Sequence, residues 1–141
     1  MTALLNGEPP SPESRARFAR PTPRIREGVW LAEQGAVSAI DVSDGLSSDL
    51  RHLACASRVC VNVDVERVPV AHGVDRLRAL QSGEEYELAC TAPAELDVDA
   101  FERRFNIPLT KIGTVVKGEP GVVFSMNGDN VEVESGYLHF E

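Results

Sequence analysis

The chain has 141 residues, a formal net charge of −8, 43% hydrophobic and 26% charged residues, which is the composition of one globular domain. A chain this acidic is a poor partner for nucleic acid because phosphates repel it. No apolar run approaches the ~20 residues of a membrane-spanning helix, and the first residues lack the basic and apolar regions of a secretory signal. We therefore expect a cytoplasmic protein without nucleic-acid or membrane partners.

Three cysteines stand at Cys55, Cys60 and Cys90. Their number is odd and they form no CxxC pair, so neither a disulfide framework nor a zinc site fits the pattern. We expect buried, reduced thiols.

Residues 1–23 are rich in Pro and Arg, which predicts a linker or an arm that enters from another domain. Residues 24–141 are expected to form the folded domain. It begins with a helix over 24–35, followed by a short apolar strand over 36–42. A second helix over 46–57 is predicted because leucines and alanine recur on one face at i, i+4, i+7 and i+8.

The later part of the chain continues the alternation of strands and helices. Strict apolar alternation over 59–65 indicates a strand with one buried face. The other expected elements are a helix over 74–81, a strand over 86–92, a helix over 93–105, a strand over 109–116, and strands over 121–126 and 131–135 that flank a hairpin turn at 127–130. This order predicts an α+β fold in which a mixed β-sheet packs with helices.

The first motif with possible chemistry lies where the strand over 36–42 ends. Asp41, Ser43 and Asp44 precede Gly45 and the next helix. Two close carboxylates suit Mg²⁺ with its phosphate ligands, and free N–H groups at a helix start favour phosphate. Alternatively, Ser43 or Asp44 is a helix N-cap.

A second acidic motif occupies 82–88, where three glutamates surround Tyr86 after a Ser-Gly pair. On a strand beginning at Glu85, Glu85 and Glu87 would share one face, and Tyr86 the other. Glu84 would lie in the loop. The alternative is a solvated acidic loop without a ligand.

In their order and spacing, these motifs resemble thiamine-monophosphate kinases, which typically show DVSDGL, then DLxHI, then GGEDYEL. The stretch before Asp41 also looks like the RPxPRxxxGxxLA segment of that family. Residues 136–140 resemble its closing Gly-aromatic-x-His-Phe. The resemblance spans about residues 15–140.

This resemblance implies transfer of the γ-phosphoryl group of ATP to thiamine monophosphate, with Mg²⁺ ions holding the phosphates. It also implies the C-terminal domain fold of the aminoimidazole-ribonucleotide synthetase-like superfamily. By similarity, Asp41 and Asp44 are Mg²⁺ ligands, Ser43 contacts ATP, and Glu84 and Tyr137 contact the thiamine substrate. We expect Glu84 and Tyr137 to lie near one another, on the same face as the two aspartates.

The sequence departs from the family pattern at three places. Ser82 replaces the first glycine of Gly-Gly, and Glu85 replaces an aspartate. Arg58 stands in a turn that usually contains glycine. The two lost glycines reduce backbone freedom, so the geometry of both loops is in question.

The resemblance further implies that the chain is a C-terminal domain. The N-terminal domain, or a partner subunit, would then supply most metal ligands and form a homodimer. Two readings stay open: an enzyme domain that is inactive alone, and a non-catalytic remnant or assembly module that pairs with another chain. A related ATP-dependent synthetase is a third reading, which DVSDGL and the Glu-Tyr-Glu segment argue against.

Overall fold

The strands form two sheets in the computed structural model, which describes residues 19–133. β1 (Ser38–Asp41) and β3 (Leu88–Thr91) form an antiparallel pair in which Asp41 lies opposite Leu88. The second sheet has the order β4-β2-β5-β6. Its strands are β2 (Cys60–Asp64), β4 (Gly113–Val116), β5 (Gly121–Met126) and β6 (Asp129–Val131). It is mixed, because β2 pairs parallel with β5 and antiparallel with β4.

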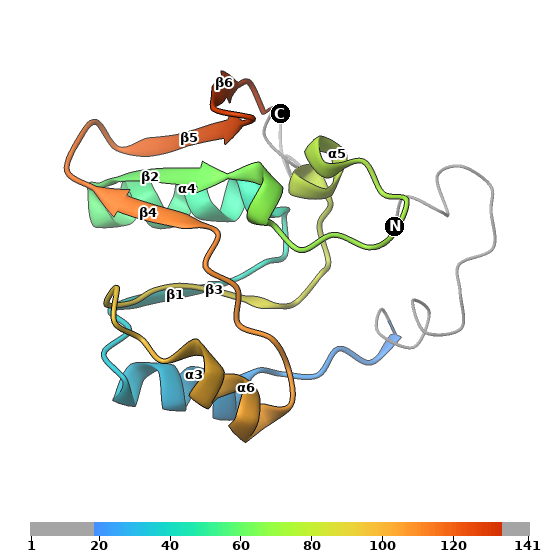
Figure 1. The fold of residues 1–141 in the computed structure, drawn as a ribbon, viewed down its shortest axis with the longest axis vertical. Helices are drawn as coiled ribbons and strands as arrows, with labels where there is room; N and C mark the ends of the chain where they lie inside the picture. The colour runs from blue at the N-terminus through green and yellow to red at the C-terminus, as the bar shows by residue number, and fades with distance from the viewer. Residues whose placement is uncertain (1–18, 134–141) are drawn as a thin grey trace.

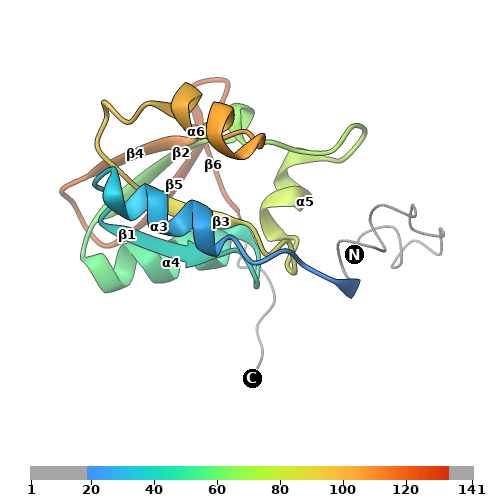
Figure 2. The same cartoon turned by 90° about the horizontal axis from the view of Figure 1, so that it is seen from below.

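The helices lie on either side of the β1–β3 pair (Figure 1). They are α3 (Ile25–Glu33), α4 (Leu46–Ser57), α5 (Arg76–Gln81) and α6 (Val98–Phe105), with a short 3₁₀ turn at Val65–Arg67. α4 contacts β5 and β2 of the larger sheet and also β1 and α5. α3 and α6 lie on the side of β1 and β3 that is opposite α4, as Figure 2 also shows. The cover of the smaller sheet is partial, because Ala39 and Asp41, which share one face of β1, are exposed.

The hydrophobic core lies between α4, α5 and the larger sheet. In β2 the buried side chains alternate, as predicted, and they are Val61 and Val63. The buried core cluster comprises Leu50, Ala54, Val61, Val63, Val65, Val68, Leu80, Phe124 and Val133. Burial of these apolar side chains is the main favourable term in the stability of this layer.

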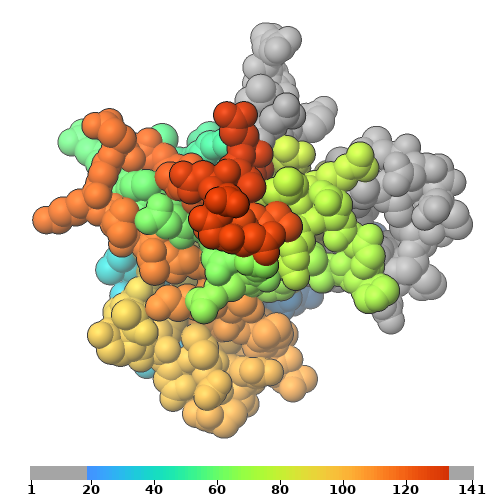
Figure 3. All heavy atoms as spheres, turned by 45° about the horizontal axis from the view of Figure 1, so that its top comes forward, coloured from blue at the N-terminus to red at the C-terminus, as the bar shows by residue number. Residues whose placement is uncertain are grey.

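A separate aromatic cluster joins α3 to α6. The ring of Trp30 lies 5.5 Å from that of Phe101 and 6.2 Å from that of Phe105, in edge-to-face geometry. Such pairs add to the stability gained by burial alone. The residues from the end of β3 through α6 gather at one end of the molecule, away from β5 and β6 (Figure 3).

The predicted fold class is confirmed, and three details are corrected. The strands divide between two sheets rather than one. The strand expected over 86–92 begins only at Leu88. Cys55 is exposed rather than buried, whereas Cys60 and Cys90 are half-buried, and burial raises the pKa of the Cys90 thiol. None of the helices in residues 19–133 is long and apolar enough to cross a membrane.

The predicted hairpin is present, but its second strand, β6, begins at Asp129 rather than at 131, so the turn is shorter than expected. A two-residue turn, Asn127-Gly128, places Met126 opposite Asp129, and both turn residues have positive φ. This geometry matches the twist of the flanking strands.

The end of α4 contains backbone strain at Arg58. This residue follows the helix with φ 55° and ψ 49°, the left-handed conformation that helix ends usually assign to glycine. A non-glycine side chain is disfavoured there by about 1–2 kcal/mol. Arginine in place of the family's glycine at this position therefore lowers the stability of the domain.

We predict that Arg58→Gly is more stable than Arg58→Ala by about 1 kcal/mol, because both variants lose the same charge and only glycine relieves the strain. At Ser57, the last helical residue, the order should reverse, with alanine more stable by up to about 1 kcal/mol. Denaturant midpoints of the four variants test this. Alanine above glycine at both positions would contradict a left-handed Arg58.

Candidate functional site

The loop between β1 and α4 contains the first predicted motif. Asp41 ends β1 and is exposed, Val42 is buried, and Ser43 and Asp44 are half-buried. The N-cap of α4 is Gly45, so neither Ser43 nor Asp44 occupies that position. The interpretation of Ser43 or Asp44 as the N-cap residue of α4 is therefore wrong.

The second motif lies directly against this loop, although the two are some forty residues apart in sequence. The Glu84 N–H donates to the Ser43 carbonyl at 2.7 Å, and the Tyr86 N–H donates to the Val42 carbonyl at 2.8 Å. The Val42 N–H donates in turn to the Glu87 carbonyl at 2.8 Å. These backbone bonds extend the β1–β3 pairing into both loops, so the two motifs form one site.

Gly83 permits this close approach. A Cβ atom at Gly83 would lie 2.5 Å from the carbonyl oxygen of Ser43, a distance at which backbone would have to move. Ser82, where the family usually has another glycine, adopts φ −74° and ψ 118°, which any residue can adopt. The loss of glycine at 82 therefore leaves the loop geometry intact.

Asp49, in the first turns of α4, holds the loop from the other side. Its side chain is only 2% exposed, and its Oδ2 accepts the N–H groups of Ser43 at 3.0 Å and Asp44 at 3.1 Å. Burial raises the pKa of Asp49, the two N–H bonds lower it, and the charges of Asp44 and Asp41 raise it. The loop is thereby bonded to α4 through a buried carboxylate.

The segment before β3 is strained at two non-glycine residues. Glu84 has φ 63° and Tyr86 has φ 51°. Strain of this kind costs about 1–3 kcal/mol per residue and gathers at functional sites. It also explains why β3 begins late: left-handed residues interrupt the alternation of side chains, so the predicted sharing of one strand face by Glu85 and Glu87 is wrong.

Glu84 has unused bonding capacity. Among the residues described, its Oε2 is the buried side-chain oxygen or nitrogen without a hydrogen-bond partner. Such an atom is costly unless a ligand or another group satisfies it. The side chain predicted to contact substrate is therefore also the one with an unmet requirement for a donor or a cation.

Glu87 has a structural partner. The guanidinium of Arg24 donates two hydrogen bonds of 2.8 Å to its two carboxylate oxygens, and this interaction raises the pKa of Arg24 although burial lowers it. Bidentate pairs of this type have fixed geometry. The pair ties the segment before α3 to the start of β3.

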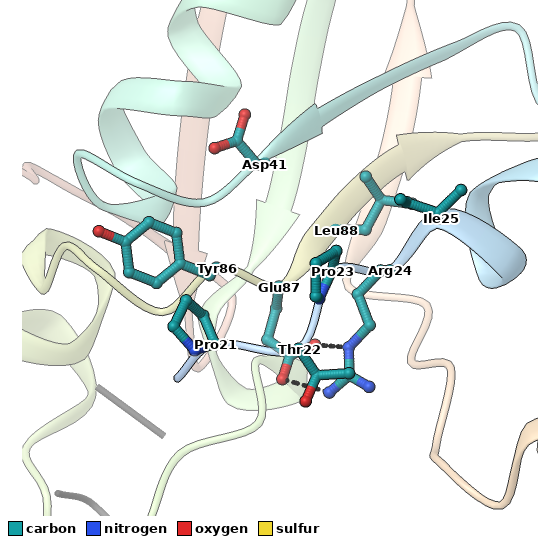
Figure 4. Close-up of a pocket in the computed structure, with 9 residues that line it drawn as sticks. All are labelled: Pro21, Thr22, Pro23, Arg24, Ile25, Asp41, Tyr86, Glu87 and Leu88. Atoms are coloured by element: carbon teal, nitrogen blue, oxygen red, sulfur yellow. Dashed lines mark hydrogen bonds and ion pairs between the residues drawn. The ribbon is translucent and has the colours of Figure 1, made fainter. Parts of the chain in front are cut away.

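A shallow pocket of about 380 Å³ lies beside this ion pair. Its lining is mostly apolar, and Figure 4 shows Asp41 at one side, at the end of β1, apart from the Arg24–Glu87 pair. The lining residues are Pro21, Thr22, Pro23, Arg24, Ile25, Asp41, Tyr86, Glu87 and Leu88. The pocket thus adjoins one predicted site residue, Asp41.

The structure brings four of the five predicted site residues into one region: Asp41, Ser43, Asp44 and Glu84. The fifth, Tyr137, lies outside the described residues, so its expected proximity to Glu84 stays a prediction. The chemical role assigned to each of these residues also stays a prediction.

Sequence reasoning missed two residues that shape the site, Asp49 and Arg24. Asp49 follows Leu46 by three positions and precedes Leu53 by four, which places it on the apolar face of α4. A carboxylate on that face was the available signal, because a buried charge requires partners. Arg24 had no comparable signal, since its partner lies 63 positions away.

The donor set suits a metal that is also held by phosphate. Within residues 19–133, no group of three or more His, Cys, Asp or Glu side chains is arranged to hold a metal ion. Asp41 and Asp44 supply two carboxylates, and Asp49 is occupied by backbone N–H groups. Mg²⁺ commonly binds one or two carboxylates together with substrate phosphates and water, so these residues fit a shared site rather than a complete protein cage.

The chain is similar to known proteins over most of its length. The family described as AIR synthase related protein, C-terminal domain, matches residues 6–125. Thiamine-monophosphate kinase of Escherichia coli K12 is 38% identical over 136 residues, which cover 88% of this chain and 41% of the relative.

Two solved structures have the same fold. A thiamine-monophosphate kinase from Stenotrophomonas maltophilia K279a superposes with a TM-score of 0.71 at 38% identity, covering 83% of this chain and 39% of that one. A structure described as AaThiL complexed with AMPPCP and TMP has a TM-score of 0.68 at 30% identity, covering 99% of this chain and 46% of that one.

The chain is an α+β domain whose DVSDGL loop is bonded to a Gly-Glu-acidic-Tyr segment. The family model matches most of its length. The chain belongs to the AIR synthase related protein family, as a C-terminal domain. Within this family, its resemblance to thiamine-monophosphate kinases is confirmed. The chain spans about two fifths of the length of these relatives.

We predict that Gly83→Ala destabilises the domain by about 1–3 kcal/mol, because its methyl group would overlap the Ser43 carbonyl. Gly121→Ala is the matched control: a Cβ there meets nothing within 4 Å, so its effect should stay within about 0.5 kcal/mol. Denaturant unfolding of both variants checks this. Equal losses would show that the two loops are not in close contact.

Proposed function

We propose that this chain is the C-terminal domain of an ATP-dependent thiamine-monophosphate kinase, which forms thiamine diphosphate. The observation that carries the proposal is the bonding of Ser43 to Glu84, which places the residues predicted for metal, ATP and substrate in one region. The resemblance to thiamine-monophosphate kinases supplies the reaction. The proposal includes a cytoplasmic location, where ATP is available.

The proposed mechanism is positioning and charge neutralisation. Phosphoryl transfer requires little covalent chemistry from the protein, provided that the γ-phosphate and its acceptor are held in line. Asp41 and Asp44 would hold Mg²⁺, which neutralises phosphate charge during the transfer. Ser43 would contact ATP from the same rigid loop, whose backbone is already fixed by Asp49 and Glu84.

Glu84 would hold the thiamine substrate. Thiamine carries a cationic ring, which a nearby carboxylate stabilises, more strongly where water is excluded. The unpartnered Oε2 supports this role because a bound cationic substrate would compensate its burial. Tyr137 would add an aromatic face for the same cation.

The rest of the active site would come from an N-terminal domain or partner subunit. The relatives are more than twice as long as this chain, and two carboxylates alone cannot hold ATP and its metal ions for transfer. A homodimer of the complete assembly is part of the same proposal.

We predict that the chain alone forms no detectable thiamine diphosphate from ATP and thiamine monophosphate, and that adding an N-terminal domain from a relative restores formation. A coupled assay with and without the added domain measures this. Turnover by the pure chain would contradict the need for a second domain. A complex that forms but stays inactive would favour the assembly-module alternative.

In the restored enzyme, we predict that Glu84→Gln raises the KM for thiamine monophosphate by about tenfold, the factor expected when one charge-assisted hydrogen bond is lost. The KM for ATP should stay unchanged. Its melting temperature should not fall, since the change removes a buried charge. Glu85→Gln, at the exposed neighbouring residue, is the control and should change neither constant. Equal effects at both positions would remove Glu84 from the substrate site.

A further inference from the structure

The loop that contains Asp41, Ser43 and Asp44 is held by two different structures. On one side, Glu84 and Tyr86 donate N–H bonds to the carbonyls of Ser43 and Val42. On the other side, Asp49 accepts the N–H groups of Ser43 and Asp44. The backbone of Ser43 is thus bonded at both its N–H and its carbonyl.

Asp49 is poorly suited to bind a metal or substrate itself. It is 2% exposed, and its Oδ2 already accepts two N–H bonds. Two N–H donors on one carboxylate oxygen are charge-assisted bonds, which are stronger than neutral ones. Their joint effect is to set the direction of the chain between β1 and α4, and hence the direction in which the side chains leave it.

Burial of a third carboxylate beside two others is unfavourable in itself. Burial and the charges of Asp44 and Asp41 all raise the pKa of Asp49. An apolar residue would pack on this face of α4 without that penalty. The N–H bonds to the loop are the interactions that compensate for it.

We propose that Asp49 is a positioning residue, whose buried carboxylate orients the backbone of Ser43 and Asp44 so that this loop presents Asp41 and Asp44 together. The role assigned to the two aspartates rests on the proposed function. The hydrogen bonds between Asp49 and the loop do not depend on the proposed function, so their effect on the loop can be tested separately.

The first test is amide hydrogen exchange on the ¹⁵N-labelled chain, with the amides of β2 as the internal reference. Asp49→Ala should speed exchange at Ser43 and Asp44 by about tenfold or more, as expected when a charge-assisted bond is lost. Asp49→Asn retains an acceptor oxygen and should speed it by only about threefold, at the same two amides. Leu53→Ala, at a buried residue of the same helix, should not single out these amides.

Three results would overturn the proposal: unchanged exchange at Ser43 and Asp44 in Asp49→Ala, equal loss in the alanine and asparagine variants, or the same local loss in Leu53→Ala. If Asp49→Ala does not fold, the asparagine variant decides. Acceleration confined to Ser43 and Asp44 then supports the role, and uniform acceleration refutes it.

The second test uses Mn²⁺ as a paramagnetic probe of the same chains. Mn²⁺ should broaden the signals of Asp41 and Asp44 first, and Asp49→Ala should require several times more Mn²⁺, whereas Leu53→Ala should not. If Mn²⁺ broadens neither signal in the unmodified chain, the two aspartates do not bind metal without phosphate or the second domain, and the exchange test decides whether Asp49 holds the loop. If the unmodified chain responds and Asp49→Ala responds equally, the positioning role is wrong.

Discussion

The site depends on the backbone of two residues, Val42 and Ser43. Their N–H and carbonyl groups are bonded to Asp49 on one side and to the segment from Glu84 to Glu87 on the other. Buried peptide groups need such partners, because leaving them unsatisfied costs stability comparable to a lost hydrogen bond. The same bonds that satisfy this loop also join motifs that are forty residues apart, so stability and the assembly of the site have one cause.

Local patterns predicted the elements well wherever periodicity reflects burial. The leucine spacing predicted α4 with its observed ends, and strict alternation predicted β2. The order of motifs predicted which residues meet, and Asp41, Ser43, Asp44 and Glu84 do lie in one region. These features are encoded within short stretches of chain, where side-chain spacing and backbone geometry are directly related.

Features that depend on distant partners could not be predicted in this way. The division of the strands into two sheets is set by which strands pair, and composition does not specify that. The start of β3 was misplaced because Glu84 and Tyr86 are left-handed, and their N–H groups are bonded to Ser43 and Val42 outside the strand. Concern about Ser82 was likewise misplaced, since the close contact falls on Gly83. In each case a tertiary contact overrides the local preference.

The ion pair between Arg24 and Glu87 has a mechanical consequence. It joins the chain arriving at α3 to the strand that begins beside the site, through two parallel hydrogen bonds that resist rotation as well as separation. The pair therefore acts as a stiff joint between residues 21–23 and the site. Because the pair is partly exposed, dissolved salt screens it, and the stiffness of this joint should decrease as ionic strength rises.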